Sequence, residues 1–259
     1  MNKKYGCYLI DLDGTIYRGE KTIQSGVDFV NRLNEKKIPY LFLTNNTTRT
    51  PEMIVAKLAS HGVITDVDHV YTPIMATVSY LLEHNPGTDS IPVYIIGQIG
   101  LWKGLLAEDR IVLDNNNPKY VIVGMDTDLT YKKICIATNA IRKGAEFIGT
   151  NSDHVLPSGD KLLPGNGSQC AMIAVASDQQ PFFIGKPSAV IVNYALKKIK
   201  KNIEESLIVG DNYETDIMAG INCRMDSLLT LTGVTTKKQL AEEKIQPTYV
   251  LNNLDEWQL

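Results

Sequence analysis

Short apolar runs alternate along the chain with longer amphipathic segments, from the first ten residues to the last. Runs such as Tyr8-Leu9-Ile10 and Leu207-Ile208-Val209 are apolar without interruption, which is typical of strands buried in a parallel sheet. The expected strands span residues 5–11, 38–44, 69–72, 93–97, 120–125, 146–150, 181–185, 206–210, 226–231 and 248–251. Strands that alternate with helices predict an α/β fold with a doubly wound, mainly parallel, Rossmann-like core.

Several helix boundaries are marked by local chemistry. Thr50-Pro51 and Thr72-Pro73 each place a capping hydroxyl before a proline, which is favoured at the first helical position. Gly62 and Gly144 stand where helices are expected to end, because glycine tolerates the left-handed backbone of a helix C-terminus. These positions predict helices that start at residues 51 and 73.

Composition excludes several classes of partner. With 44% apolar and 21% charged residues, the 259-residue chain is typical of a soluble globular protein. A net charge of −3 gives no reason to expect nucleic acid or an acidic membrane as a partner. No apolar run is long enough for a signal peptide or a spanning helix, and the scattered cysteines favour free thiols, so we expect a cytoplasmic protein.

The first apolar strand ends in an acidic motif, Asp11-Leu12-Asp13-Gly14-Thr15. Ligands of doubly wound sheets bind at the carboxyl ends of the strands, which is where this pair of carboxylates lies. Two acids there can hold a hard metal through oxygen, attack an electrophile and move protons. An Asp-rich turn is the alternative, because Asp and Gly are common turn residues.

Three further polar groups close apolar strands. Thr44-Asn45-Asn46 offers a hydroxyl and N–H groups suited to a phosphate oxygen, although a helix cap or an Asx-turn would use the same residues. Lys186 follows the strand at 181–185 and can neutralise phosphate charge or be solvated at the surface. Asp211 follows the strand at 206–210, and Asp216 is expected in the first turn of the next helix. These groups together form one candidate constellation.

Two polar breaks divide the chain. Asn85-Pro86-Gly87 is the first, and Ser177-Asp178-Gln179-Gln180-Pro181 is the second. The segment between them has its own βα units and is long enough for a small domain. Because the candidate residues fall on both sides of it, we expect a core made of residues 1–87 and 181–259, with an inserted α/β domain at 88–180.

The order of these motifs resembles the haloacid dehalogenase superfamily of aspartate-nucleophile phosphatases. The matching strings are DLDGT at residues 11–15, Thr44, Lys186 and GDNYETD at residues 210–216, and the resemblance covers essentially the whole chain. The Thr44-Asn45-Asn46 loop and the Ile184-Gly185-Lys186-Pro187 string resemble the NagD-type branch, in which an α/β cap follows the third core strand. Within that branch the sequence is similar to the acid sugar phosphatases of Gram-positive bacteria.

The resemblance implies a role for each matching residue. Asp11 would attack phosphorus to form an aspartyl-phosphate, and Asp13 would protonate the leaving oxygen and then activate water. The implied phosphate-binding residues are Thr44, Asn45, Asn46 and Lys186. The implied Mg²⁺ ligands are Asp11, the backbone carbonyl of Asp13, and Asp211, with Asp216 behind a bound water or holding Lys186.

Three other functions would use some of the same residues. A phosphomutase of the same fold would pass the phosphoryl group on instead of hydrolysing the intermediate. A signalling receiver domain also uses Asp, Thr and Lys, but its phosphoacceptor closes the third strand, and the third strand here ends at Tyr71-Thr72. A dehalogenase would not need Asp13. No Walker motif or G-x-S-x-G elbow is present, and the histidines lack metal-ligand spacing.

The substrate must be selected outside these motifs, because the core chemistry treats all phosphate monoesters alike. The inserted segment carries polar loops after its apolar strands, and the candidate substrate-binding residues there are Asp126, Asn151 and Asp153. The expected partner is a small phosphorylated metabolite: a sugar phosphate, an acid sugar phosphate or a nucleotide. The oligomeric state stays open, with a homodimer as one option.

Overall fold

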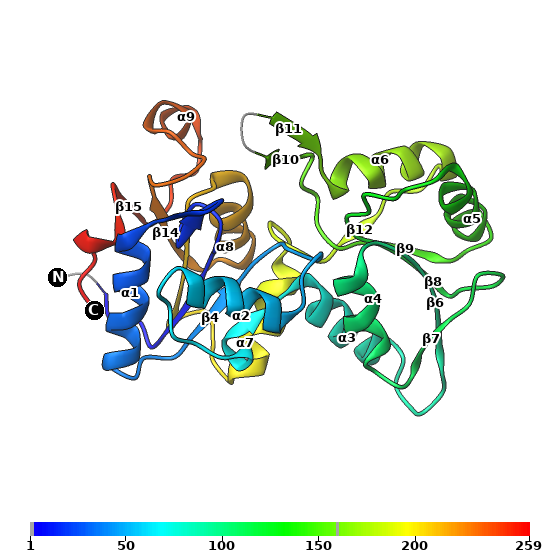
Figure 1. Cartoon of the computed structure of the whole chain (residues 1–259), viewed down its shortest axis with the longest axis horizontal. Helices are drawn as coiled ribbons and strands as arrows, with labels where there is room; N and C mark the ends of the chain where they lie inside the picture. The colour runs from blue at the N-terminus through cyan, green and yellow to red at the C-terminus, as the bar shows by residue number, and fades with distance from the viewer. Residues whose placement is uncertain (1–2, 159–160) are drawn as a thin grey trace. The chain divides into compact units, whose positions relative to one another are not determined.

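The computed structural model describes residues 3–158 and 161–259, and the chain divides into two compact units (Figure 1). Unit 1 comprises Met1–Thr44, Pro51–Tyr71 and Lys186–Leu259. Unit 2 comprises Asn45–Thr50 and Thr72–Gly185. The chain therefore passes between the units several times, and each unit has its own sheet and its own apolar core.

A parallel sheet forms the centre of unit 1. Its strands are β1 (Cys7–Ile10), β4 (Tyr40–Leu43), β5 (Val70–Tyr71), β13 (Ser206–Gly210), β14 (Asp226–Thr230) and β15 (Tyr249–Leu251). They lie in the order β15-β14-β13-β1-β4-β5, and every neighbouring pair is parallel. Along the chain, β1 is followed by β4 and β5 on one side of the sheet. β13, β14 and β15 follow later on the other side of β1. The strand order reverses between β1 and β13, which is where ligands bind in such sheets.

Helices cover both faces of the unit 1 sheet. They are α1 (Gln24–Glu35), α2 (Pro51–Ser60), α7 (Ala189–Ile199), α8 (Met218–Cys223) and α9 (Lys237–Glu242). Phe29 of α1 and Leu58 of α2 pack in a buried cluster that includes Leu228 of β14. The next residue of that strand, Leu229, belongs to a separate buried cluster with Leu240 of α9. Because successive strand residues face opposite sides of a sheet, the two clusters show that both faces are covered.

Unit 2 repeats this architecture on a smaller scale (Figure 1). Its parallel sheet contains β6 (Ile91–Ile96), β7 (Ile111–Leu113), β8 (Tyr120–Val123), β9 (Glu146–Gly149) and β12 (Phe182–Phe183), in the order β12-β9-β8-β6-β7. Its helices are α3 (Pro73–His84), α4 (Ile99–Leu106), α5 (Tyr131–Arg142) and α6 (Asn166–Ser177). The core packs α5 and α6 against one face of β6, β8 and β9. A separate antiparallel hairpin joins β10 (Val155–Ser158) to β11 (Lys161–Pro164).

Short elements complete the chain. They are β2 (Tyr17–Arg18), β3 (Lys21–Thr22), η1 (Val67–His69), the π-helical turn η2 (Tyr213–Ile217) and η3 (Leu254–Glu256). β2 and β3 form an antiparallel hairpin soon after β1. Strands of this length leave no apolar run, which is why the sequence pattern did not predict them.

The predicted α/β fold with parallel, doubly wound sheets is confirmed, and each predicted strand overlaps an observed one. α3 starts at Pro73, and the Thr72 hydroxyl accepts a hydrogen bond from the Met75 N–H, as predicted. β7 was not predicted: it is an edge strand on which Val112 and Leu113 are exposed, so it lacks a continuous buried run. The β10–β11 hairpin was also missed.

The unit boundaries differ from the expected segments. α3 belongs to unit 2 although it precedes residue 88. β12 was expected in the core segment, but Phe182 and Phe183 pair with Ile148 and Gly149 of β9. The main insertion begins at Thr72, directly after β5, which is the third strand of the unit 1 sheet along the chain.

The cysteines are free thiols, as expected, and Cys7, Cys170 and Cys223 are buried. Among residues 3–158 and 161–259, no helix combines the length and the apolar character that crossing a membrane requires.

Candidate active site

Asp11 stands immediately after β1 in the middle of the unit 1 sheet. Its backbone N–H donates to the Val209 carbonyl at 2.8 Å, which continues the β1–β13 ladder up to the carboxylate. The chain then turns sharply: the Thr15 and Ile16 N–H groups both donate to the Leu12 carbonyl. This turn leaves the Asp11 side chain buried and the Asp13 side chain exposed.

The second acidic pair follows β13, the neighbour of β1. Asp211 and Asp216 are each 1% exposed. Asn212 caps the π-helical turn η2, its side chain accepting from the Glu214 N–H, and its own backbone N–H donates to Asp216 Oδ2 at 3.1 Å. Asp216 therefore lies in the first helical turn after the strand, where the sequence pattern predicted it.

Lys186 joins the two acidic segments. Its Nζ lies 2.6 Å from Asp11 Oδ1 and 2.6 Å from Asp216 Oδ1, and the side chain is 2% exposed. Burial alone would lower the pKa of the Lys186 ammonium, but the charges of Asp11 and Asp216 outweigh it and raise that pKa. The lysine therefore stays charged. Of the two arrangements expected for Asp216, the structure contains the contact with Lys186.

The buried acids are held at an electrostatic cost. Burial, followed by the negative charge of Asp216, raises the pKa of the Asp11 carboxyl well above its usual range, and Lys186 opposes this shift. Burial raises the pKa of Asp211 to about 7, with Asp216 adding to the effect and the Val234 N–H opposing it. One lysine balances only one of three buried carboxylates, so the cluster favours a further cation.

The donor set fits a hard divalent cation. Asp11, Asp211 and Asp216 offer carboxylate oxygens that all lie within 4.8 Å of one another. Among the residues that the structure describes, Asp211 Oδ1 is buried and has no hydrogen-bond partner. A buried carboxylate oxygen without a donor is costly unless something positive faces it. Mg²⁺ prefers oxygen ligands of this kind and needs only a few from the protein.

Thr44 lies at the same edge of the sheet as Asp11. It follows β4, which pairs in parallel with β1, so that Phe42 is the partner of Ile10. Thr44 is buried, and its N–H donates to the Tyr71 carbonyl at 3.4 Å. Unit 1 therefore brings together Asp11, Thr44, Lys186 and both acids of the Asp211–Asp216 segment.

Asn45 and Asn46 belong to unit 2, where both have local partners. Asn45 Nδ2 lies 3.2 Å from Asp153 Oδ1, and the Asn151 side chain donates to the Asn45 carbonyl at 3.0 Å. Asn46 Oδ1 accepts from the N–H groups of residues 48 and 49. The structure thus joins one residue expected at phosphate, Asn45, to two residues expected at the substrate, Asn151 and Asp153.

Asp126, the remaining candidate in unit 2, is buried at the carboxyl end of its sheet, beyond β8. Lys133 of α5 donates to its Oδ2 at 2.7 Å. The Gln169 side chain accepts from the Asp126 N–H and donates to the Asp126 carbonyl. These contacts connect the loop to α5 and to α6.

The sequence pattern did not single out the loop after β14. The loop after β14 contacts Asp211 directly: the Val234 N–H donates to Asp211 Oδ2 at 2.6 Å, and the Thr235 N–H donates to the Asp211 carbonyl at 3.1 Å. Thr232 Oγ1 donates to the Gly14 carbonyl at 2.6 Å. The sequence pattern that located the other site residues, polar residues directly after an apolar strand, is also present here. β14 lies beside β13 and is followed by polar residues.

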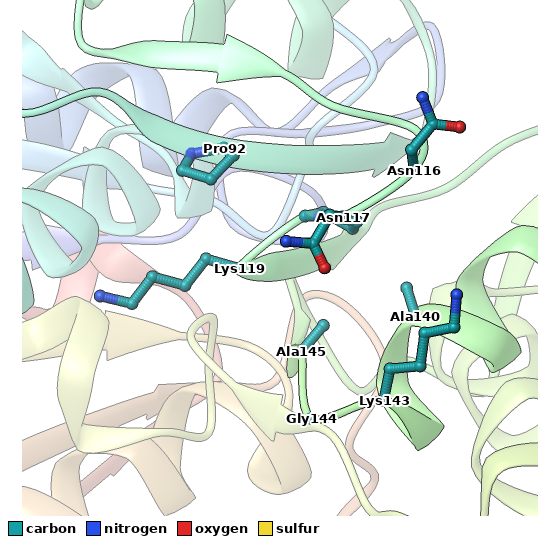
Figure 2. A pocket seen from close by; sticks show the side chains of 9 residues that line it. Pro92, Asn116, Asn117, Lys119, Ala140, Lys143, Gly144 and Ala145 are labelled. Atoms are coloured by element: carbon teal, nitrogen blue, oxygen red, sulfur yellow. The ribbon is translucent and has the colours of Figure 1, made fainter.

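A surface pocket on unit 2 does not belong to this constellation (Figure 2). It has a volume of ≈ 260 Å³, and its lining includes Pro92 of β6, Lys119 before β8 and Ala145 before β9. These residues mark the amino edge of the sheet, whereas Asp126 and Asn151 lie at the carboxyl edge. None of the lining residues carries a carboxylate or a hydroxyl, so the pocket lacks the acids and the hydroxyl that make up the candidate constellation.

Comparison with known proteins agrees with this geometry. A family model described as haloacid dehalogenase-like hydrolase matches residues 8–109, and a second model of HAD-like hydrolases matches residues 183–257. The chain is 41% identical over 255 residues to the 5′-nucleotidase YutF of Bacillus subtilis, covering 98% of each. It is 41% identical over 254 residues to an acid sugar phosphatase of Staphylococcus saprophyticus, covering 98% of this chain and 97% of the relative.

Solved structures show the same likeness. A thermostable NPPase double mutant from Geobacillus stearothermophilus matches with a TM-score of 0.91 and 43% identity, covering 99% of both chains. NagD from Escherichia coli K-12 matches with a TM-score of 0.90 and 28% identity, also covering 99% of both. The resemblance inferred from the four motifs is confirmed.

Proposed function

Because the chain belongs to the haloacid dehalogenase-like hydrolases, as a phosphatase of the NagD type, we propose that it hydrolyses small phosphorylated metabolites with Mg²⁺ through an aspartyl-phosphate. The observation that supports this most directly is the ion-paired Asp11 at the end of β1. A buried lysine holds one of its oxygens, and two further buried acids stand beside it. A buried, oriented carboxylate of this kind is suited to nucleophilic attack.

The proposed reaction has two displacements at phosphorus. A carboxylate oxygen of Asp11 attacks the phosphoryl group, the ester P–O bond breaks, and Asp13 transfers its proton to the departing oxygen. Asp13 then removes a proton from water, which attacks the aspartyl-phosphate and releases phosphate with Asp11 regenerated. The exposed position of Asp13 supports this role, because the group must reach both the leaving oxygen and water.

The remaining groups of the site balance charge and orient the reacting groups. Lys186 fixes the direction of the Asp11 carboxylate through Oδ1, and Asp216 fixes Lys186 in turn. We assign Thr44, Asn45 and Asn46 to the phosphate oxygens. Phosphoryl transfer depends mainly on such positioning and charge stabilisation.

Mg²⁺ would be held by Asp11, Asp211 and the backbone carbonyl of Asp13, with Asp216 behind them on Lys186. Bound there, it would neutralise charge on the transferring phosphoryl group. The buried and unpartnered Oδ1 of Asp211 supports this assignment.

The proposal predicts phosphate release that depends on the metal. Purified protein is incubated with sugar phosphates, phosphorylated acids and nucleotides, and free phosphate is measured with Mg²⁺, with excess chelator, and after Mg²⁺ is restored. We expect activity to disappear with chelator and to return with Mg²⁺. Full activity in excess chelator would contradict the proposed mechanism. An isomerised product without free phosphate would indicate a phosphomutase, and a stable phosphoprotein without turnover would indicate a signalling domain.

The names of the relatives suggest nucleotides and acid sugar phosphates as the substrate class. We propose that this chain acts on a small phosphorylated substrate of this kind, and that unit 2 selects it. The loops at Asp126 and at Asn151 to Asp153 follow apolar strands at one edge of that unit's sheet. Polar groups fixed there can discriminate strongly against substrates that lack their hydrogen-bond partners.

We expect Asp126→Ala and Asn151→Ala to change the ranking of substrates across the same panel while Mg²⁺ affinity stays within about twofold. Asp126→Ala removes a buried acid and frees Lys133, which alters the charge at this edge. Asp128→Ala is the matched control, because it removes an exposed acid from the same loop. Unchanged rankings and rates in both variants would exclude these loops from substrate selection.

A further inference from the structure

We propose that the loop after β14, residues 231–235, positions Asp211 for the cation, with Thr232 and Thr235 as its positioning residues. This inference deepens the proposed function and rests on its metal site. It concerns residues that do not themselves bind the cation. Partners of this kind orient metal ligands and tune their affinity.

The two oxygens of the Asp211 carboxylate have different surroundings. Oδ2 accepts the Val234 N–H at 2.6 Å. Oδ1 is buried and, among the described residues, has no partner. A donor on one oxygen only fixes the rotation of the carboxylate and leaves the other oxygen to face a ligand. The loop therefore sets the orientation of Asp211 before any cation arrives.

Thr235 connects the loop to the backbone at Asp211 and just after it. Its N–H donates to the Asp211 carbonyl at 3.1 Å, and its Oγ1 accepts from the Tyr213 N–H at 2.8 Å. Tyr213 opens the π-helical turn that carries Asp216. Thr235 is buried, so neither contact is exposed to competition from bulk water.

Thr232 ties the same loop to the acidic motif after β1. Its hydroxyl donates to the Gly14 carbonyl at 2.6 Å and lies 3.2 Å from the Thr230 hydroxyl. Gly14 directly follows Asp13, whose backbone carbonyl is a proposed ligand. One threonine hydroxyl thus connects the loop that holds Asp211 to the turn that presents Asp13.

Glycines stand where the loop after β14 and the turn after β1 pack against Asp211. A Cβ at Gly233 would lie 1.8 Å from Asp211 Oδ2, and a Cβ at Gly14 would lie 2.2 Å from the same atom. Gly14 also has a φ of +93°, a backbone conformation that residues other than glycine rarely adopt. Because Gly233 and Gly14 have no side chains, the loop after β14 and the turn after β1 can both pack directly against the Asp211 carboxylate.

The test measures binding of Mg²⁺ alone, without substrate, by calorimetry in Thr232→Val and Thr235→Val. Valine keeps the branched shape and removes the hydroxyl. We expect Mg²⁺ to bind about 10- to 100-fold more weakly, the range found when partners of metal ligands are removed. In turnover assays the Mg²⁺ concentration for half-maximal rate should rise similarly, while the KM for substrate at saturating Mg²⁺ stays within about twofold.

Two controls separate positioning from a general structural role. Thr232→Ser keeps the hydroxyl and should retain wild-type Mg²⁺ affinity. Thr236→Val removes the N-cap of α9, which accepts the Gln239 N–H at 3.2 Å, and should lower Tm without changing Mg²⁺ affinity. Equal weakening in Thr232→Ser and Thr232→Val would overturn the proposal.

Folded valine variants with wild-type Mg²⁺ affinity would also overturn it. Thr232 is only partly buried, so Thr232→Val decides the matter if Thr235→Val does not fold. Wild-type protein that binds no Mg²⁺ would overturn the metal site of the proposed function as well. Normal Mg²⁺ binding with no phosphate release would overturn the proposed reaction alone.

Discussion

Asp11→Asn is expected to lower phosphate release by on the order of 10⁴-fold or more while the protein stays folded. Asparagine has nearly the same volume, but its amide cannot form the covalent intermediate and is a poorer ligand for Mg²⁺. Asp216 still pairs with Lys186 at 2.6 Å, so the buried ammonium keeps one carboxylate partner. The measurements are kcat with an aryl phosphate and a sugar phosphate, together with a thermal melt.

Asp13→Asn is the matched comparison for this prediction, because it changes the other acid of the same turn. Its backbone carbonyl remains in place, so the proposed metal ligand is kept and only the proton donor is lost. We expect a severe loss with sugar phosphates, whose alkoxides need protonation, and a milder loss with aryl phosphates. Undiminished turnover by folded Asp11→Asn, or equal losses across leaving groups in Asp13→Asn, would contradict the assigned roles.

Lys186→Met is expected to destabilise the protein by about 3–5 kcal/mol at pH 7 and to abolish activity. The ammonium is the 2.6 Å partner of both Asp11 and Asp216, and all three side chains are buried. Without it, Asp11 and Asp216 would lose their ion pairs in a site where burial already raises the pKa of Asp11. The measurement is the free energy of unfolding in urea, without metal.

The pH dependence of this effect has a definite sign. A carboxyl whose pKa is higher in the folded than in the unfolded protein binds more protons when folded, so stability falls as pH rises above about 4. Loss of Lys186 raises the pKa of Asp11 further. The difference in stability between Lys186→Met and the wild type should therefore grow from pH 4 to pH 7.

Two variants serve as controls for the lysine. Lys3→Met removes an exposed ion pair with Asp226 and should cost less than about 1 kcal/mol. Adding Asp216→Asn to Lys186→Met removes one of the uncompensated carboxylate charges and should restore part of the lost stability. If Lys186→Met unfolds at the same urea concentration as Lys3→Met at pH 7, the buried ion pairs do not carry the stability assigned to them.

Much of the fold and of the proposed chemistry was predictable from local pattern. Apolar runs located the strands of the unit 1 sheet, and polar residues that follow three of these strands include Asp11, Thr44 and Asp211. This succeeds because burial on both faces of a parallel sheet requires apolar residues at consecutive positions, and a strand must end where polar residues begin. The family of the chain followed from the same strand ends.

Other features depend on contacts between distant parts of the chain. Asn45 and Asn151 are hydrogen-bonded across 106 positions, and Thr232 reaches Gly14 across 218 positions. β12 lies in the unit 2 sheet because Phe182 and Phe183 pair with β9, although a polar break precedes it. The apolar and polar pattern of a segment specifies which of its faces is buried, but not which other segment buries it.

The sequence by itself therefore determined the parallel α/β architecture and the acids, hydroxyl and lysine at the strand ends. Only the tertiary structure decided that Lys186 bridges Asp11 and Asp216 and that Asn45 is hydrogen-bonded to Asp153. It also decided that the loop after β14 donates a hydrogen bond to Asp211. The physical reason is that a hydrogen bond needs two groups within about 3 Å of each other. Such proximity is set by how the elements pack, whereas strand and helix formation follow from the spacing of residues along the chain.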